Sequence, residues 1–144
     1  MPNFLQSFQK PFLFLLLGVT TNLFAELPKK PTDPKDALFS SKLITTTTEG
    51  HAVEVKAKIK GIQNLYLTVS DGGNSYSCDW ADWALPRLVD NNGNETRLTD
   101  LKWEHAKSGW GKVQINKNCG GRPLRINGKD IEYGIGTHAN SEIH

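Results

Sequence analysis

PLRINGKDIEY, residues 123–133, is the stretch that indicates the fold most clearly. Two short runs containing apolar residues flank Asn127-Gly128 at its centre. An Asn-Gly pair readily adopts the two positive φ angles of a type I′ turn, and this turn joins neighbouring antiparallel strands tightly. The stretch therefore predicts a tight β-hairpin near the end of the chain.

Upstream of the hairpin, apolar and polar residues alternate in two further segments. The first begins after His51, with apolar residues at 53, 55, 57 and 59 and charged residues between them. The second covers residues 65–70 and ends at Asp71-Gly72-Gly73-Asn74. A period of two is typical of a half-buried strand, so we expect a strand in each segment.

Shorter extended pieces are expected between these segments and the hairpin. Residues 84–89 look extended, and Pro86 places them at an edge or a bulge because proline cannot donate to a ladder. The turn-forming residues 91–94 follow, and further extended pieces lie near Leu98, at 101–103 and at 111–116. No window has the 3.6-residue period of a helix. The sequence thus predicts an all-β fold, an antiparallel sandwich or barrel.

The N-terminus has the features of an export signal. One positive charge, Lys10, precedes the apolar run PFLFLLLGV at residues 11–19, which is shorter than the roughly 20 residues that span a bilayer. Leu23 and Ala25 occupy the positions that signal peptidase reads, so we expect cleavage after Ala25 and a secreted or periplasmic mature chain that is not held in the membrane. The alternatives are an uncleaved anchor or a buried amphipathic helix.

We therefore divide the chain into a signal peptide (1–25), a Pro- and Thr-rich linker or arm (26–50) and a β-sandwich module (51–144). The net charge of +2 comes from scattered basic and acidic residues, which argues against a nucleic-acid partner. The mature chain keeps Cys78 and Cys119. Export permits a disulfide between them, but two separately buried thiols remain an equal alternative because sequence does not place their Cα atoms.

From about Leu65 to the end, an ordered set of motifs resembles the NPCBM family of carbohydrate-binding modules. The motifs are CDWADWA (78–84), PRL (86–88), LTDL (98–101), Trp103, SGWG (108–111), PLRING (123–128) and GIGTHANSEI (134–143). The resemblance implies a galactose-binding-like jelly-roll sandwich, found on secreted proteins and beside glycoside hydrolase domains, that recognises carbohydrate without catalysis. Family members continue with further strands, so we expect this module to be incomplete at its C-terminus and to be a fragment of a larger protein.

Sugar recognition needs an aromatic ring to stack on a pyranose and polar groups to bind its hydroxyls. The candidate residues for this role are Tyr76, Asp79, Trp80, Asp82, Trp83, His138 and Asn140. The alternative for Trp80 and Trp83 is a place in the core, and for the aspartates a role in turns. We interpret Trp103 and Trp110 as core residues, and His138 as a residue that hydrogen-bonds to the backbone of its own loop.

Neither a cofactor nor catalysis is expected. Asp71, Asp79 and Asp82 could hold a structural calcium, but their spacing matches no EF-hand loop, and the dispersed histidines form no zinc pattern. Asp79 and Asp82 could form a glycosidase pair, but 119 mature residues offer little depth for a cleft, and Gly-x-Ser-x-Gly is absent. We therefore expect a non-catalytic carbohydrate-binding module. The alternative is a structural module that docks proteins, in which Trp80 and Trp83 would both be buried.

Overall fold

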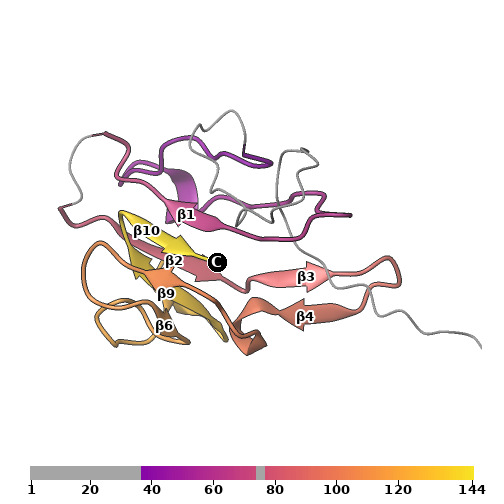
Figure 1. Ribbon diagram of the computed structural model, residues 1–144. Helices are drawn as coiled ribbons and strands as arrows, with labels where there is room; N and C mark the ends of the chain where they lie inside the picture. Colours follow the sequence, from indigo (N-terminus) through magenta and orange to yellow (C-terminus); the bar gives the residue numbers. More distant parts are fainter. Residues whose placement is uncertain (1–36, 74–76) are drawn as a thin grey trace, which may run out of the picture.

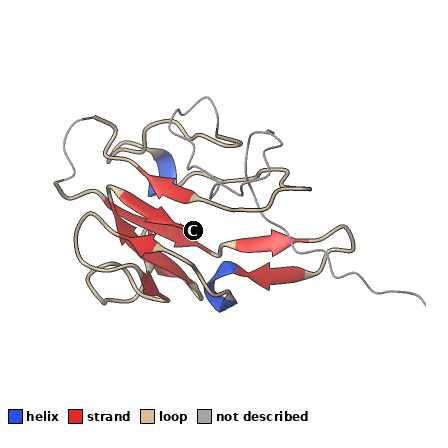
Figure 2. Ribbon diagram, viewed as in Figure 1, coloured by secondary structure: helices blue, strands red, loops and turns tan. Residues whose placement is uncertain are grey.

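The computed structural model describes residues 37–73 and 77–144 (Figure 1). Within these residues the chain is built of short strands and two 3-10 helices. The strands are β1 (Leu67–Val69), β2 (Trp80–Ala84), β3 (Arg87–Val89), β4 (Glu95–Arg97), β5 (Ala106–Lys107), β6 (Gln114–Ile115), β7 (Arg125–Ile126), β8 (Lys129–Asp130), β9 (Gly134–His138) and β10 (Ser141–Ile143). The 3-10 helices are η2 (Glu49–His51) and η3 (Leu98–Asp100). The fold is all-β, as the sequence predicts (Figure 2).

Two antiparallel three-stranded sheets form the body of the molecule. Their strand orders are β1-β10-β5 and β2-β9-β6. In Figure 1 the strands β1 and β10 lie above β2, β9 and β6, so the sheets form two layers. The hairpins β3-β4 and β7-β8 complete the described strands. The architecture is an antiparallel β-sandwich.

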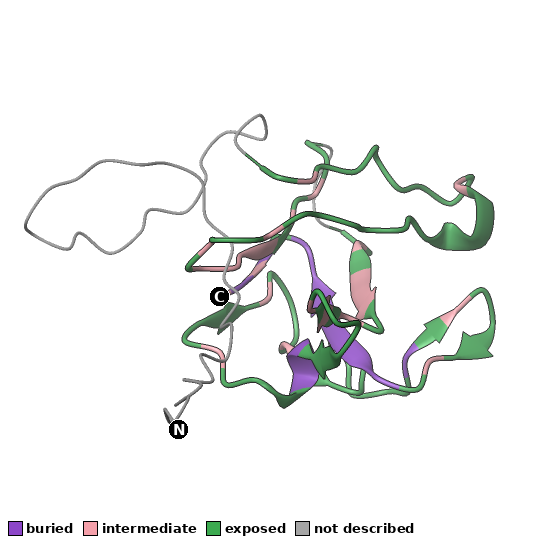
Figure 3. Ribbon diagram, turned by 90° about the vertical axis from the view of Figure 1, so that its right-hand side faces the viewer, coloured by how far each residue is buried: buried purple, intermediate pink, exposed green. Residues whose placement is uncertain are grey.

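The core lies between the two sheets. Leu98 of η3, Ile135 of β9 and Ile143 of β10 form its buried cluster. Partly buried side chains from both sheets and the connecting segments pack against this cluster: Leu65, Leu67, Trp83, Leu88, Trp103 and Val113. Strand β9 is buried along its whole length and runs through the middle of the molecule (Figure 3). Ile135 of β9 and Trp83 of β2 point into the core, so the positions next to them along these strands lie on the opposite face of the sheet.

The hairpin predicted around Asn127-Gly128 is confirmed. Strands β7 and β8 pair with Ile126 opposite Lys129, and Asn127 and Gly128 have φ values of 49° and 74°. The predicted turn at residues 91–94 is also confirmed, because it joins β3 to β4. The carboxylate of Asp90 stabilises that turn by accepting the backbone N–H groups of Asn92 and Asn94.

The strand expected at residues 53–59 is wrong. The structure assigns no strand there, and Val53 and Val55 are 42% and 45% exposed. Alternation shows only that a strand at these residues would have one apolar face. No described sheet covers the apolar residues of this segment. Two other expectations are confirmed: the strand at residues 65–70 contains β1, and residues 111–116 contain β6. Two are wrong: Leu98 begins a 3-10 helix instead of an extended piece, and residues 101–103 form no strand. In the described part of the chain, no helix has the length and apolarity to cross a membrane.

Candidate functional site

The strand register brings two of the candidate residues together on the outer face of the β2-β9-β6 sheet. Trp80 is directly opposite His138, and Trp83 is directly opposite Ile135. Residues opposite each other in a ladder share a face, and faces alternate along a strand. Because Ile135 and Trp83 pack in the core, Trp80 and His138 lie on the other, outward face.

Trp110, from the loop between β5 and β6, joins this pair. The ring centroids of Trp80 and Trp110 are 5.6 Å apart, and those of Trp110 and His138 are 5.9 Å apart. Trp80 is edge-on to His138 at 6.2 Å. Trp80 is 48% exposed and Trp110 is 53% exposed, whereas His138 is only 4% exposed. Two half-exposed indoles therefore flank a buried imidazole, and we call Trp80, Trp110 and His138 the aromatic face.

Backbone contacts hold the aromatic face in place. His138 Nδ1 is 2.8 Å from the carbonyl oxygen of Ala139, and the His138 backbone N–H donates to Ser108 Oγ. The Ser108 hydroxyl donates to the carbonyl oxygen of Trp110 at 2.6 Å. Gly109 lies so close to the Ala139 backbone that a Cβ there would overlap it. The segment carrying Trp110 is thus fixed against the end of β9.

The six-membered ring of the Trp80 indole lies against Gly120. A Cβ at Gly120 would lie 2.8 Å from Cη2 of the Trp80 indole, which shows how closely the glycine backbone approaches the ring. Residue 120 therefore has to be small for the indole to keep this position.

The tryptophans follow the predictions unevenly. Trp83 and Trp103 pack against the core. This agrees with our interpretation of Trp103 and with the second of our two interpretations of Trp83, a place in the core. The interpretation of Trp110 as a core residue is wrong, because more than half of it is exposed. Its flanking glycines permit this position but do not by themselves predict it: Gly109 allows a close approach to the Ala139 backbone, and Gly111 has a positive φ of 66°.

Two other candidates, Asp79 and Asn140, lie beside this face, next to Trp80 and near His138 in the sequence. The interpretation of His138 as a residue bonded to backbone agrees with its contact to Ala139. Asn140 interacts with Asp71, accepting its backbone N–H through Oδ1 and donating to its carboxylate through Nδ2. Asp79 precedes Trp80, is half-buried, and accepts the Ala139 N–H through its carbonyl oxygen. Tyr76 lies outside the described residues.

Asp82 lies on the same face of β2 as Trp80, two residues further along. Its Oδ1 is buried and has no hydrogen-bond partner. Burial raises the pKa of the Asp82 carboxyl from 3.8 to about 6, and a hydrogen bond with the Thr137 backbone offsets part of this shift. Asp82 is therefore a half-buried carboxyl that stays largely protonated below about pH 6, instead of an open acceptor for sugar hydroxyls.

We predict that Asp82→Asn raises the melting temperature at pH 7.5 by about 5 °C and leaves it unchanged near pH 3.5. The pKa of this carboxyl is higher in the folded chain than in the unfolded chain. The stability it contributes is therefore present below about pH 3.8 and is lost as the pH rises to about 6. Circular dichroism melts across this range measure the effect. Asp100→Asn, at an exposed position, is the control, and equal shifts for both variants at pH 7.5 would contradict the prediction.

Cys78 is exposed and Cys119 is buried, and both are free thiols in the structure. The structure does not contain the bridge between them that the sequence allowed. Burial raises the pKa of the Cys119 thiol, and the charge of Asp82 adds to the increase, which places these two side chains near each other.

The described residues contain no group of three or more His, Cys, Asp or Glu side chains that could hold a metal ion. Of the aspartates considered for calcium, Asp71 interacts with Asn140 and Asp82 is covered. The calcium site stays a prediction without a located ligand set.

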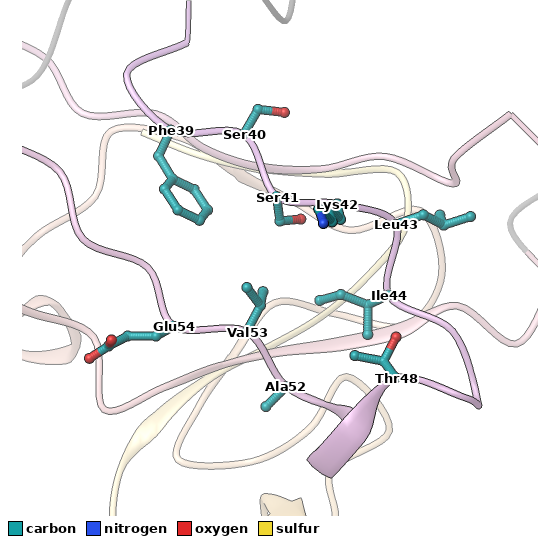
Figure 4. A pocket seen from close by; sticks show the side chains of 10 residues that line it. All are labelled: Phe39, Ser40, Ser41, Lys42, Leu43, Ile44, Thr48, Ala52, Val53 and Glu54. Carbon is teal, nitrogen blue, oxygen red and sulfur yellow. The ribbon is translucent and has the colours of Figure 1, made fainter.

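A separate pocket of about 350 Å³ lies in the N-terminal segment (Figure 4). Its lining residues are Phe39, Ser40, Ser41, Lys42, Leu43, Ile44, Thr48, Ala52, Val53 and Glu54. Its lining combines aliphatic side chains such as Ile44 and Val53 with hydroxyl and charged side chains, and Phe39 is its one aromatic ring. It lacks the pair of exposed rings that the aromatic face provides.

The fold and this site define a β-sandwich with an exposed aromatic face. The family model of the NPCBM/NEW2 domain matches residues 33–89 and 94–144. The chain therefore belongs to the NPCBM/NEW2 domain family, as its motifs indicate. No curated protein and no solved structure matches the chain.

Proposed function

We propose that this chain is an exported, non-catalytic module that binds carbohydrate through its aromatic face. The observation that carries the proposal is the pair of half-exposed indoles, Trp80 and Trp110, with centroids 5.6 Å apart. Exposed tryptophan is costly to leave in water, and its flat apolar surface matches the C–H face of a pyranose. Membership of a family of carbohydrate-binding modules supports the same ligand class.

Isothermal titration of the mature chain against plant, algal and mucin polysaccharides tests this function. We expect saturable heat with at least one of them, and no release of reducing sugar during the incubation. Heat that is unchanged by EDTA would agree with recognition that needs no metal. The absence of heat with every polysaccharide would overturn the proposal.

The alternative of a protein-docking module requires Trp80 and Trp83 to be buried together. Trp83 packs against the core, but Trp80 is 48% exposed. Exposure of the first indole beside a second one favours a ligand-binding face. Attached domains of a longer protein would, under our proposal, be held on the glycan by this module.

Export is the second part of the proposal, and it rests on residues 1–25, which lie outside the described part. We expect the mature protein to begin at Glu26 and to appear in the periplasm or the medium. N-terminal sequencing of the exported protein measures this directly. Retention of Met1 in a membrane fraction would instead indicate an uncleaved anchor.

A further inference from the structure

Residues 116–122, between β6 and β7, form a compact loop that we call the capping loop. The side chain of Asn118 organises it: Oδ1 accepts the backbone N–H groups of Gly120 and Arg122. The Asn118 N–H donates to the Arg122 carbonyl, and the Gly121 N–H donates to the Asn118 carbonyl. Because these bonds close within the loop, its middle can move as one unit.

The capping loop lies over the outer face of the β2-β9-β6 sheet. At Gly136 of β9, a Cβ would overlap the backbone of Lys117 and Asn118. The Gln114 side chain of β6 donates to the carbonyl oxygens of Asn118 and Cys119. The loop is therefore in direct contact with the sheet at β9 and β6.

Asp82 lies on the covered part of this face. It is directly opposite Gly136, so its carboxyl projects from the face on which the capping loop rests. The titratable and charged groups around it are few. β9 brings His138 two residues from Gly136, β6 brings the neutral Gln114, and the loop brings Lys117 and the thiol of Cys119, whose pKa responds to Asp82. No basic side chain lowers the pKa of Asp82, and the hydrogen bond with the Thr137 backbone offsets only part of the effect of burial.

The same loop supports the aromatic face. Gly120 rests against Cη2 of Trp80, and the Cys119 carbonyl accepts the Lys112 N–H, two residues after Trp110. A displacement of the capping loop would therefore remove a support of Trp80 and loosen the segment that carries Trp110.

We propose that the capping loop is a proton-dependent lid, which closes on the sheet while the Asp82 carboxyl is protonated and loosens when that carboxyl ionises. A half-buried carboxylate with one oxygen, Oδ1, buried and without a hydrogen-bond partner is disfavoured, and water admitted beneath the loop would solvate that oxygen. Opening is favoured as the pH rises through about 6, because the open form solvates the charge.

The test uses the reactivity of Cys119, which is buried next to Asp82. In the mature chain, Cys78→Ser leaves Cys119 as the one thiol. We compare its rate of reaction with 4,4′-dithiodipyridine in this variant and in Cys78→Ser/Asp82→Asn from pH 4 to pH 8. We divide the rate of Cys78→Ser by that of the double variant, which removes the change in thiolate fraction that both share. The charge of Asp82 raises the pKa of Cys119 in the first variant alone, and this effect lowers the ratio, so it cannot produce the expected rise.

We expect the ratio to rise about tenfold between pH 4 and pH 7 and then to level off. A flat ratio in two variants that both melt cooperatively would overturn the lid, because Asp82 would then ionise without opening the loop. If Asp82→Asn does not fold, amide hydrogen exchange at residues 118–122 in the Cys78→Ser chain replaces this comparison. Protection factors, which are already corrected for the intrinsic pH dependence of exchange, should fall as the pH rises. Protection factors that stay constant from pH 4 to pH 8 would overturn the proposal.

The consequence for glycan binding rests on the proposed function. Because the closed loop supports Trp80, the affinity for a bound polysaccharide should fall severalfold from pH 5 to pH 8, and Asp82→Asn should remove this dependence. A rise in the Cys119 ratio without any glycan binding would keep the lid and reject the function. Binding with a flat ratio would keep the function and reject the lid.

Discussion

Trp80→Ala and Trp110→Ala should each weaken glycan binding at least tenfold, and the double variant should show no measurable binding. Each indole is about half exposed while still held by the protein, so a sugar ring could cover its free surface with little loss of side-chain entropy. Tryptophans at the centre of an interface commonly account for 2 kcal/mol or more, and about 1.4 kcal/mol corresponds to tenfold in affinity. Isothermal titration with the polysaccharide that binds the unmodified chain measures the loss.

Val89→Ala is the matched control for these two variants. Val89 is 52% exposed on β3, so its truncation removes exposed apolar surface outside the aromatic face. We expect its affinity to equal that of the unmodified chain. If Trp80→Ala and Trp110→Ala fold and bind as tightly as Val89→Ala, the glycan binds elsewhere.

Gly136→Ala should destabilise the fold more than any other single methyl addition that we consider. The added Cβ would overlap the backbone of Lys117 and Asn118, and backbone atoms cannot move aside as the end of a flexible side chain can. Either the capping loop shifts outward or β9 loses its register, at a cost of about 2–3 kcal/mol. A thermal melt should show a decrease on the order of 10 °C.

Gly93→Ala isolates the cost of the methyl group itself. Gly93 has a φ of 84°, but nothing lies within 4 Å of the added Cβ. This variant therefore carries only the strain of a side chain at positive φ, about 1 kcal/mol. Equal melting temperatures for the two variants would show that the capping loop does not press on β9 as the structure indicates.

Local turn chemistry was the most reliable guide from sequence to fold. Asn127-Gly128 and residues 91–94 specify their turns through backbone preferences that need no distant partner, and both hairpins are present. Alternation at residues 53–59 predicted a strand that is absent, because a strand also needs a neighbouring edge and a surface to cover. Neither requirement is visible in a local pattern.

The candidate site shows the same division between local and distant information. Trp80 and His138 were named from motifs 58 positions apart, and their pairing across β2 and β9 depends on register. Trp110 was missed because an indole between two glycines can pack inside or lie outside, and the Ala139 backbone decides which. Asp82 was named as a sugar ligand because carboxylates bind hydroxyls, but the covering loop could not be inferred from its neighbours in sequence.

The most direct measurement of the central claim follows the four tryptophan indole N–H signals by nitrogen-15 correlation NMR during titration with a bound soluble oligosaccharide. The four signals are assigned with single Trp→Phe variants. The account predicts that the signals of Trp80 and Trp110 shift saturably together, while those of Trp83 and Trp103 stay in place. Saturable shifts confined to Trp83, Trp103 or amides of residues 38–62 would contradict it.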